Sequence, residues 1–264
     1  MSDNTLLAEV VTIVETAGEL LRERFTAEPP HLDDREQVVA AIHANDEAVL
    51  DLLREPLLAA RPGAGWVEDE LEGGELPAGE WWVVDPAEGN INHIHGLTDW
   101  GLTATLVRDN QPVLTVVHLP LAGTTYTAIA GGGAYQDGVP LSPSAKKSFD
   151  CAMVGTGQAK PGESAETYRR IGESVTAVLA TGAAVRVSVP ATLQLIHVAA
   201  GRMDVFWQFS DVRSGLVAGA LLVAEAGGVL TDVRGEPWSV GSESVLATAP
   251  GLHGEAVELL GGVR

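Results

Sequence analysis

The sequence predicts an α/β fold made of two unlike parts. In the first half, two stretches with apolar residues at helical spacing precede short β-like runs separated by turn signals, a pattern typical of helices packed on an antiparallel sheet. From about residue 150 the pattern changes to strands that alternate with helices, which is typical of an α/β unit. We therefore expect an α+β subdomain over residues 1–145 and an α/β subdomain over residues 146–264.

The first half begins with two predicted helices, over residues 5–25 and about 37–59. Asp3 and Asn4 can cap the first helix, and the second ends before an Arg-Pro-Gly break at 61–63. An acidic, glycine-rich loop is expected over 64–80. The β-like runs that follow lie at 81–85, 101–107, 112–119 and 124–130, and the segments 131–133 and 136–138 read as turns.

The second half supplies the alternating pattern. Its predicted elements are a strand at 151–155, a helix at 163–180, a strand at 184–189, a helix at 191–200, a strand at 203–207, a helix at 212–226, a strand at 228–233 and a helix at 252–260. The helix at 212–226 is rich in small residues and ends at Gly227-Gly228, which is a typical C-terminal stop.

Composition limits the partners of the chain. The net charge of −20 disfavours a nucleic-acid or anionic-membrane partner, and a protein this acidic would need cations to handle an anionic substrate. Cys151 is the single cysteine, which excludes an internal disulfide and fits a reducing compartment. No apolar run approaches the roughly 18 to 20 residues of a membrane span, and the first residues lack the basic region of a signal peptide. We expect a cytoplasmic protein that acts on a small molecule.

Residues 81–96, WWVVDPAEGNINHIHG, are the first candidate site. The apolar run stops at Asp85-Pro86, and Glu88 follows three residues after Asp85. Two carboxylates this close repel each other unless a cation lies between them, so the segment suggests a site for a hard metal ion. Asp85-Pro86 could instead simply open a turn, with Glu88 exposed. The four apolar residues before Asp85 favour the metal site.

The other candidates are the acidic loop at 68–70 and Asp211. The loop alone would be read as solvent-exposed. Asp211 is predicted in the first turn of the small-residue helix, where the helix dipole favours an anion. Ser210 or Asp211 could equally be a simple N-cap.

The chain resembles the inositol monophosphatase family, whose members are Mg²⁺-dependent, lithium-sensitive phosphatases of small phosphomonoesters. The resemblance rests on three features in this order: the acidic loop, the D-P-x-E-G block, and the aspartate before a helix that ends in E-A-G-G. The resemblance covers nearly the whole chain and includes residues 85–92, the GGGAYQDG turn at 131–138 and the helix end at 225–229. It implies a layered αβαβα sandwich, Mg²⁺ as cofactor and a homodimer.

The resemblance also implies roles for residues. The metal ligands it implies are Glu70, Asp85, the Ala87 carbonyl, Glu88 and Asp211, with Asp46 as an outer carboxylate. Which of Glu68, Asp69 and Glu70 is the motif carboxylate stays open; Glu70 or Asp69 in that position would also orient the attacking water.

Substrate contacts follow from the same resemblance. The backbone N–H groups of Gly89 and Asn90 would contact the phosphate. Gln208 and Asp211 would contact the rest of the substrate.

The chain departs from the family at four of these positions. Glu88 replaces an aspartate, Asn90 replaces the threonine that helps to activate water, Ser210 replaces a tryptophan, and Gln208 replaces an acid. An amide can hold a water molecule but cannot relay a proton as a hydroxyl can.

His93 stands where the family usually has an aromatic residue. On an extended segment its side chain would share a face with that of His95, so His93 is a candidate for new chemistry, whereas His95 is more typical of a structural hydrogen-bonding residue.

Three functions remain open from the sequence. The leading one is Mg²⁺-dependent hydrolysis of a sugar, cyclitol or amino-alcohol phosphate by an activated water. The alternative is a repurposed enzyme of the same fold, with weak or no metal binding, that isomerises, cyclises or dehydrates a biosynthetic intermediate. It would use Glu88, Asn90, His93 and the acidic loop. The third is a catalytically silent binding protein.

Overall fold

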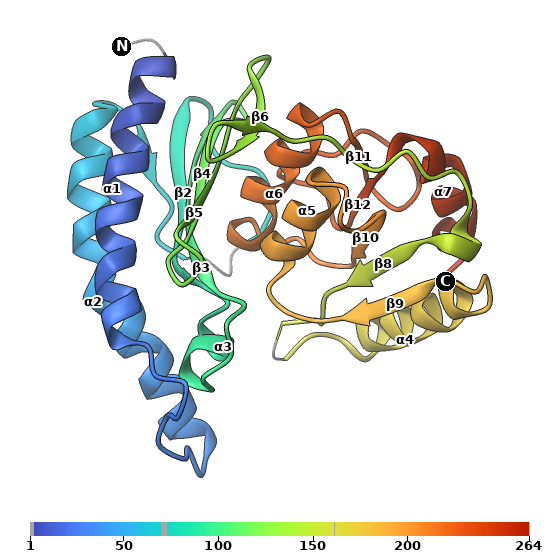
Figure 1. The fold of residues 1–264 in the computed structure, drawn as a ribbon, viewed down its shortest axis with the longest axis horizontal. Coiled ribbons are helices and arrows are strands. Elements are labelled where there is room, and N and C mark those ends of the chain that lie inside the picture. Colours follow the sequence, from blue (N-terminus) through green and yellow to red (C-terminus); the bar gives the residue numbers. More distant parts are fainter. Residues whose placement is uncertain (1–2, 70–72, 161, 264) are drawn as a thin grey trace.

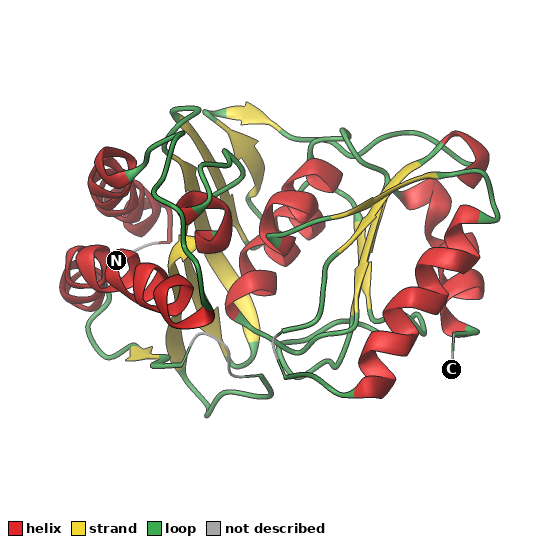
Figure 2. Cartoon of the chain, turned by 90° about the horizontal axis from the view of Figure 1, so that it is seen from below, coloured by secondary structure: helices red, strands yellow, loops and turns green. Residues whose placement is uncertain are grey.

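The computed structural model describes residues 3–69, 73–160 and 162–263. They form five layers in the order helix, sheet, helix, sheet, helix (Figures 1 and 2). Two helices cover the outer face of the first sheet, two lie between the sheets, and two cover the outer face of the second sheet. The predicted layered αβαβα sandwich is confirmed.

The first sheet is nearly all antiparallel. Its seven strands lie in chain order: β1 (Gly65–Trp66), β2 (Glu80–Glu88), β3 (Gly101–Arg108), β4 (Gln111–Leu119), β5 (Thr124–Ile129), β6 (Gly133–Gln136) and β7 (Val139–Pro140). Only β1 pairs in parallel, with β2. Simple hairpins therefore connect β3 through β7.

Helices α1 (Asp3–Arg24) and α2 (Arg35–Ala60) form the first layer. α1 turns a single apolar stripe toward the sheet, which contains Leu6, Val10, Val14, Ala17 and Leu21, all fully buried. The spacing of this stripe is the one that the sequence predicted. α2 begins at the N-cap Asp34, whose carboxylate accepts the N–H of Gln37 at 2.9 Å.

The central layer holds α5 (Ala191–Ala199) and α6 (Ser214–Glu225). Nearly all of α6 is buried, because it packs on the first sheet on one side and on the second sheet on the other. This explains its small and apolar composition, since charged side chains could not be accommodated between two sheets.

The second sheet has the order β11-β12-β10-β8-β9. Its strands are β8 (Met153–Thr156), β9 (Ala184–Val187), β10 (Val205–Gln208), β11 (Val229–Thr231) and β12 (Val245–Thr248). β8, β9 and β10 run parallel, whereas β12 is antiparallel to β10 and β11. The outer layer consists of α4 (Ala165–Leu179) and α7 (His253–Gly261), and short 3₁₀ turns, η1 (Phe149–Cys151) and η2 (Pro250–Leu252), complete the chain.

Several elements differ from those that the sequence predicted. β1, β7 and β12 were not expected, and β6 lies where turns were predicted. The most important difference is α3 (Asn90–Ile94), a short helix in a segment that was expected to be extended. No helix of the described ranges combines the length and the hydropathy of a membrane span.

Candidate functional site

The D-P-x-E-G segment opens onto a cavity of about 330 Å³ between the two halves of the chain. The first half contributes the end of β2, the start of α3 and the middle of α2; the second half contributes the start of α5, the end of β10 and the segment before α6. The lining residues are Ile42, Asp46, Asp85, Ala87, Glu88, Gly89, Asn90, Ile91, Gln158, Ala159, Lys160, Val189, Pro190, Ala191, Gln208, Ser210, Val212, Gly215 and Leu216.

A break in the register of β2 places its two carboxylates at the cavity. The pairing with β3 shifts between Asp85 and Glu88, and the strand continues to Glu88 instead of ending at Asp85 as predicted. Pro86 has no N–H to donate, so it fits only where the ladder is interrupted. The Asp85 carboxylate accepts the N–H of Ala87 at 3.0 Å, which holds this turn.

Glu88 is buried, with 4% of its surface exposed. The hydroxyl of Thr192, on α5, donates to its Oε2 at 2.7 Å. A residue of the second half therefore fixes a carboxylate of the first half. A hydrogen bond to a buried charge is among the stronger ones in proteins, about 1.5 to 3 kcal/mol.

Gly89 makes the sharp turn from β2 into α3. Its φ is 78°, in the left-handed region, and a Cβ at this position would lie 2.7 Å from the Asp99 carbonyl oxygen and 3.0 Å from Pro190 Cγ. Only glycine meets both requirements. Gly89 and the first residues of α3, Asn90 and Ile91, line the cavity.

The Asn90 side chain is tied to α2 by three hydrogen bonds. Its Nδ2 donates to the Asp46 carboxylate at 2.8 Å and to the Ile42 carbonyl oxygen at 3.0 Å, and its Oδ1 accepts from Asn45 Nδ2 at 2.9 Å. Both amide hydrogens are thus used within the protein. Asn90 cannot donate to a water in the cavity without giving up one of these contacts.

Asp46 titrates at an unusually high pH for a carboxylate. Burial raises its pKa to about 6, and the nearby charge of Glu47 adds to this rise. The Asn90 hydrogen bond and His43 lower the pKa by smaller amounts. Asp46 also lines a neighbouring cavity of about 240 Å³ together with Glu68. It is therefore a carboxylate that can take up a proton near neutral pH.

The wall from the second half carries Gln208, Ser210 and Lys160. Gln208 ends β10, and its Oε1 is buried without a hydrogen-bond partner, which is costly unless a ligand or water supplies one. Ser210 Oγ accepts the N–H of Val212 at 3.2 Å.

Asp211 does not lie in the first turn of α6, and that prediction is wrong. The helix begins at Ser214, and its N-cap is Arg213, whose carbonyl oxygen accepts the N–H groups of Leu216 and Val217. Asp211 is absent from the described lining of the cavity, and one of its oxygens lies 3.7 Å from Lys160 Nζ.

Arg213, at the start of α6, holds the two glycines that follow the acidic loop. The buried guanidinium of Arg213 donates to the carbonyl oxygens of Gly73 and Gly74 at 2.6 and 2.8 Å. Glu68 pairs with Arg54 on α2, and Asp69 is exposed. Glu70 lies outside the described residues.

His93 points away from the cavity. Because residues 90–94 are helical, His93 and His95 do not share a face, and the prediction that they do is wrong. The buried His93 ring lies beside Asn45 and the Leu21 carbonyl oxygen, and burial lowers its pKa. His95 is exposed and bonds the Ile91 carbonyl oxygen through Nδ1 at 2.8 Å.

The oxygen ligands at the cavity fit Mg²⁺ chemically. Asp85 and Glu88 supply carboxylates, and Mg²⁺ in enzymes is usually held by one or two carboxylates together with water and substrate phosphate. Within the part of the chain that the structure describes, no three or more acidic, histidine or cysteine side chains gather closely enough to hold a metal by themselves.

Three functional neighbours could not be read from the sequence, namely Thr192, Asn45 and Arg213. Each acts on a residue that is far away in the chain: Thr192 on Glu88, Asn45 on Asn90 and Arg213 on the acidic loop. The one available signal was that Asn45 directly precedes Asp46, on a helix whose buried face is otherwise apolar.

Comparison with known proteins gives one consistent family. The model of the inositol monophosphatase family matches residues 3–262. An inositol-1-monophosphatase of Rhizobium meliloti is 31% identical over 245 residues, 92% of this chain and 91% of that protein. Inositol monophosphatase 1 of Solanum lycopersicum is 30% identical over 96% of this chain and 94% of its own length. A Nus factor SuhB of Pseudomonas aeruginosa is 33% identical over 65% of this chain and 62% of its own length.

Solved structures agree on the fold. An inositol monophosphatase from Anabaena superposes with a TM-score of 0.81 at 23% identity, covering 99% of this chain and 97% of that one. Mycobacterium tuberculosis SuhB superposes with a TM-score of 0.79 at 25% identity, covering 100% and 99%.

Proposed function

Because the chain belongs to the inositol monophosphatase family, we propose that it hydrolyses a small phosphomonoester in an Mg²⁺-dependent reaction. The substrate classes proposed are sugar, cyclitol and amino-alcohol phosphates. The observation that carries the proposal is the shared cavity at which Asp85, Glu88 and the Gly89 turn meet.

The residues at the cavity have separate proposed roles. Asp85, with the Ala87 carbonyl, and Glu88 would hold Mg²⁺, which when bound supplies Lewis-acid polarisation of the phosphoryl oxygens. The N–H groups at the Gly89 turn face the same space and suit a phosphate oxygen. Thr192 keeps Glu88 in place.

Asp46 is proposed as the proton acceptor for the attacking water. The family's threonine hydroxyl is replaced by Asn90, whose amide cannot pass a proton on. Asp46 lines the cavity beside it, with a pKa of about 6, so at neutral pH it is mostly ionised and able to take the proton. Glu70 or Asp69 would orient the water, and Gln208 would contact the alcohol part of the substrate.

The test is release of inorganic phosphate from a panel of phosphomonoesters across an Mg²⁺ titration. The panel includes inositol 1-phosphate, glucose 6-phosphate, glycerol phosphate and phosphoethanolamine. Asp85→Asn is expected to lower kcat/KM by about 100-fold or more, since removal of one charge-stabilising group commonly costs 10²–10³.

Asp51→Asn is the matched control, because Asp51 is exposed on α2 and does not line the cavity. Its activity should equal that of the wild type. If the wild-type protein releases no phosphate from any ester at any Mg²⁺ concentration, the proposed hydrolysis is refuted.

The alternative function, a non-hydrolytic reaction on the same fold, is supported by the state of Asn90. Its amide hydrogens are used in contacts to α2, and no hydroxyl replaces the one that the family uses on water. A relative that carries the name Nus factor also indicates that membership of the family does not fix one role. Following the panel by ³¹P and ¹H NMR separates the two functions: hydrolysis yields inorganic phosphate, whereas isomerisation, cyclisation or dehydration changes the ester and leaves it phosphorylated.

Two further expectations belong to this proposal. Family resemblance suggests a homodimer, which sedimentation velocity would test. The exposed free thiol of Cys151 fits a cytoplasmic protein, since oxidising compartments favour paired cysteines.

A further inference from the structure

A continuous line of side-chain hydrogen bonds connects the outside of α1 with the cavity. Arg24 Nε donates to Asn45 Oδ1 at 2.9 Å, Asn45 Nδ2 donates to Asn90 Oδ1 at 2.9 Å, and Asn90 Nδ2 donates to Asp46 Oδ1 at 2.8 Å. We call these four residues the amide relay. It starts at a cation and ends at the carboxylate with the raised pKa.

The direction of the relay is fixed by its two ends. A guanidinium only donates hydrogen bonds, and an ionised carboxylate only accepts them. Turning over either asparagine amide would place a donor against a donor and an acceptor against an acceptor. The two amides therefore have one compatible orientation, and each polarises the next in the same sense.

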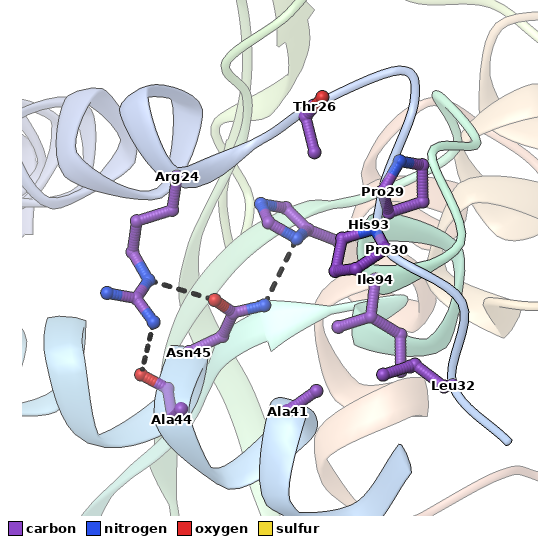
Figure 3. Close-up of a pocket in the computed structure, with 10 residues that line it drawn as sticks. All are labelled: Arg24, Thr26, Pro29, Pro30, Leu32, Ala41, Ala44, Asn45, His93 and Ile94. Carbon is purple, nitrogen blue, oxygen red and sulfur yellow. Dashed lines mark hydrogen bonds between the residues drawn. The ribbon is translucent and has the colours of Figure 1, made fainter. Parts of the chain in front are cut away.

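His93 supports the relay from the side. The second hydrogen of Asn45 Nδ2 points to His93 Nδ1 at 3.1 Å (Figure 3). His93 Nε2 lies 3.0 Å from the Leu21 carbonyl oxygen. Nε2 must then carry the proton, and Nδ1 must be the acceptor. The family usually has an aromatic residue at position 93. The histidine found here has the role of accepting the remaining hydrogen of Asn45 Nδ2.

The residues of the relay line different cavities. Arg24, Asn45 and His93 line a second cavity of about 280 Å³ beside the loop that follows α1, and Figure 3 shows Arg24 reaching Asn45 and the Ala44 carbonyl oxygen across it. Asn90 and Asp46 line the first cavity. Arg24 itself does not line the first cavity, and the relay is its hydrogen-bonded connection to that cavity.

We propose that Asn45 and Arg24 are positioning residues: they fix the Asn90 amide so that it holds Asp46 in the cavity. The kinetic consequence rests on the proposed phosphatase function, whereas the structural consequence does not. Without Asn45, the buried Asn90 Oδ1 loses its hydrogen-bond donor. The amide orientation that donates to Asp46 is then less strongly favoured, so the amide can rotate away from Asp46. Asp46 then loses the contact that orients it toward the substrate.

The sharpest test uses Arg24, because its exposed position at the end of α1 tolerates substitution. Arg24→Met removes the donor and keeps most of the side chain. Arg22→Met, on the same exposed helix end, removes an equal charge with no contact to the relay. We expect Arg24→Met to lower kcat by about three- to tenfold with KM unchanged, Arg24→Lys to recover part of the loss, and Arg22→Met to match the wild type.

A second readout does not need any activity. In ¹⁵N-labelled protein, the side-chain NH₂ hydrogens of Asn90 should exchange slowly with solvent, since both are bonded in a buried site. We expect their exchange to become at least several-fold faster in Arg24→Met and faster still in Asn45→Ala. Thr105→Val loses a buried hydrogen bond to Thr115 far from the cavity and should leave these signals unchanged.

The two readouts separate failure of this inference from failure of the proposed function. If the wild type releases no phosphate, the proposed function fails, and the exchange measurement decides on the relay alone. Unchanged Asn90 exchange in folded Arg24→Met, with unchanged kcat where activity exists, would overturn the positioning role. Equal effects of Arg22→Met and Arg24→Met would overturn it as well, because they would show a general effect of charge.

Discussion

Asn90 is tied into the protein in a way that a threonine at the same position could not reproduce. The amide satisfies Asn45, Asp46 and the Ile42 carbonyl oxygen at once, whereas a hydroxyl has a single hydrogen to donate. The asparagine that replaces the family's threonine therefore satisfies three neighbouring polar groups. Any change at position 90 also affects these three groups.

This leads to a prediction for Asn90→Thr, the change that restores the family's residue. We expect the free energy of unfolding to fall by about 1–3 kcal/mol, since buried polar groups of Asn45 and Ile42 lose a partner. Urea unfolding followed by tryptophan fluorescence measures the change. We also expect no gain in kcat, and a variant as stable as the wild type with higher kcat would contradict the role assigned to the amide.

At the residue scale, sequence predicted most of one cluster. Asp85, Ala87, Glu88, Gly89 and Asn90 reach one cavity because they are consecutive at a strand end, so their proximity needs no knowledge of the fold.

His93 and Asp211 were placed wrongly for local reasons. A one-turn helix reversed the face of His93, and α6 starts later than its composition suggested. Short helices and helix starts depend on tertiary contacts, which periodicity in one segment does not contain.

At the element scale, the end of α6 clamps the hairpin between β5 and β6. Glu225, the last residue of α6, accepts the N–H groups of Gly131 and Gly133 at 2.8 and 2.9 Å. The sequence showed both segments as parts of one family pattern but gave no sign that they touch. The clamp joins the central helix layer to the first sheet.

Removal of this clamp should weaken the molecule measurably. For Glu225→Ala we expect a loss of about 1–3 kcal/mol in the free energy of unfolding, because two backbone donors lose a charged acceptor. Glu225→Gln, which keeps one acceptor oxygen, should lose less. Glu243→Ala, at an exposed position, is the control, and equal stability of the Glu225 and Glu243 variants would rule out the clamp as a significant contact.

A second element-scale contact is sensitive to acid. Glu80, at the start of β2, lies between Arg61 at the end of α2 and Arg108 at the end of β3, with N–O distances of 2.7 and 2.8 Å. The Arg61 hydrogen bond is the main reason that its pKa falls from 4.5 to about 2. The ionised form is thus favoured in the folded state.

Because this pKa is depressed, the contribution of Glu80 to stability is complete above about pH 4.5 and is lost as the pH falls toward 2. Glu80→Gln should be less stable than the wild type at pH 7, and the difference should shrink between pH 4.5 and 2. Urea unfolding of both proteins at half-unit steps of pH measures this. A difference that stays constant across the window would disprove the linkage.

At the scale of the whole molecule, the net charge of −20 opposes the approach of any phosphate ester. Salt screens this repulsion, since the Debye length falls from about 30 Å at 0.01 M to about 8 Å at 0.15 M. At saturating Mg²⁺ we expect kcat/KM to rise a few-fold over this range. Choline chloride should have the same effect as NaCl. A kcat/KM that falls as the salt concentration rises would show that positive charges near the site, and not the net charge, govern the association of the substrate.

The sequence patterns predicted an α+β half followed by an α/β half, because amphipathic stripes and hairpin turns are local features. The layered αβαβα order was predicted only through the family resemblance. β12 was missed because it pairs with β10 and β11, whose positions a single segment does not reveal. β7 was missed because it is only two residues long and pairs with β6 across the turn that the sequence did predict. The division at residue 145 stays a prediction, and the shared core around α6 shows that the two halves pack on a common layer.

The one-way order of the amide relay also has an evolutionary consequence. Asn90 needs the donor of Asn45, whose other hydrogen needs the acceptor at His93. A threonine at position 90 has one hydrogen to donate and cannot serve both Asp46 and the Ile42 carbonyl oxygen. Single substitutions between the two states pass through an intermediate with unpaired buried groups, so the three positions are expected to change together along a lineage. Relatives that carry asparagine at position 90 should therefore inherit its partners as a set.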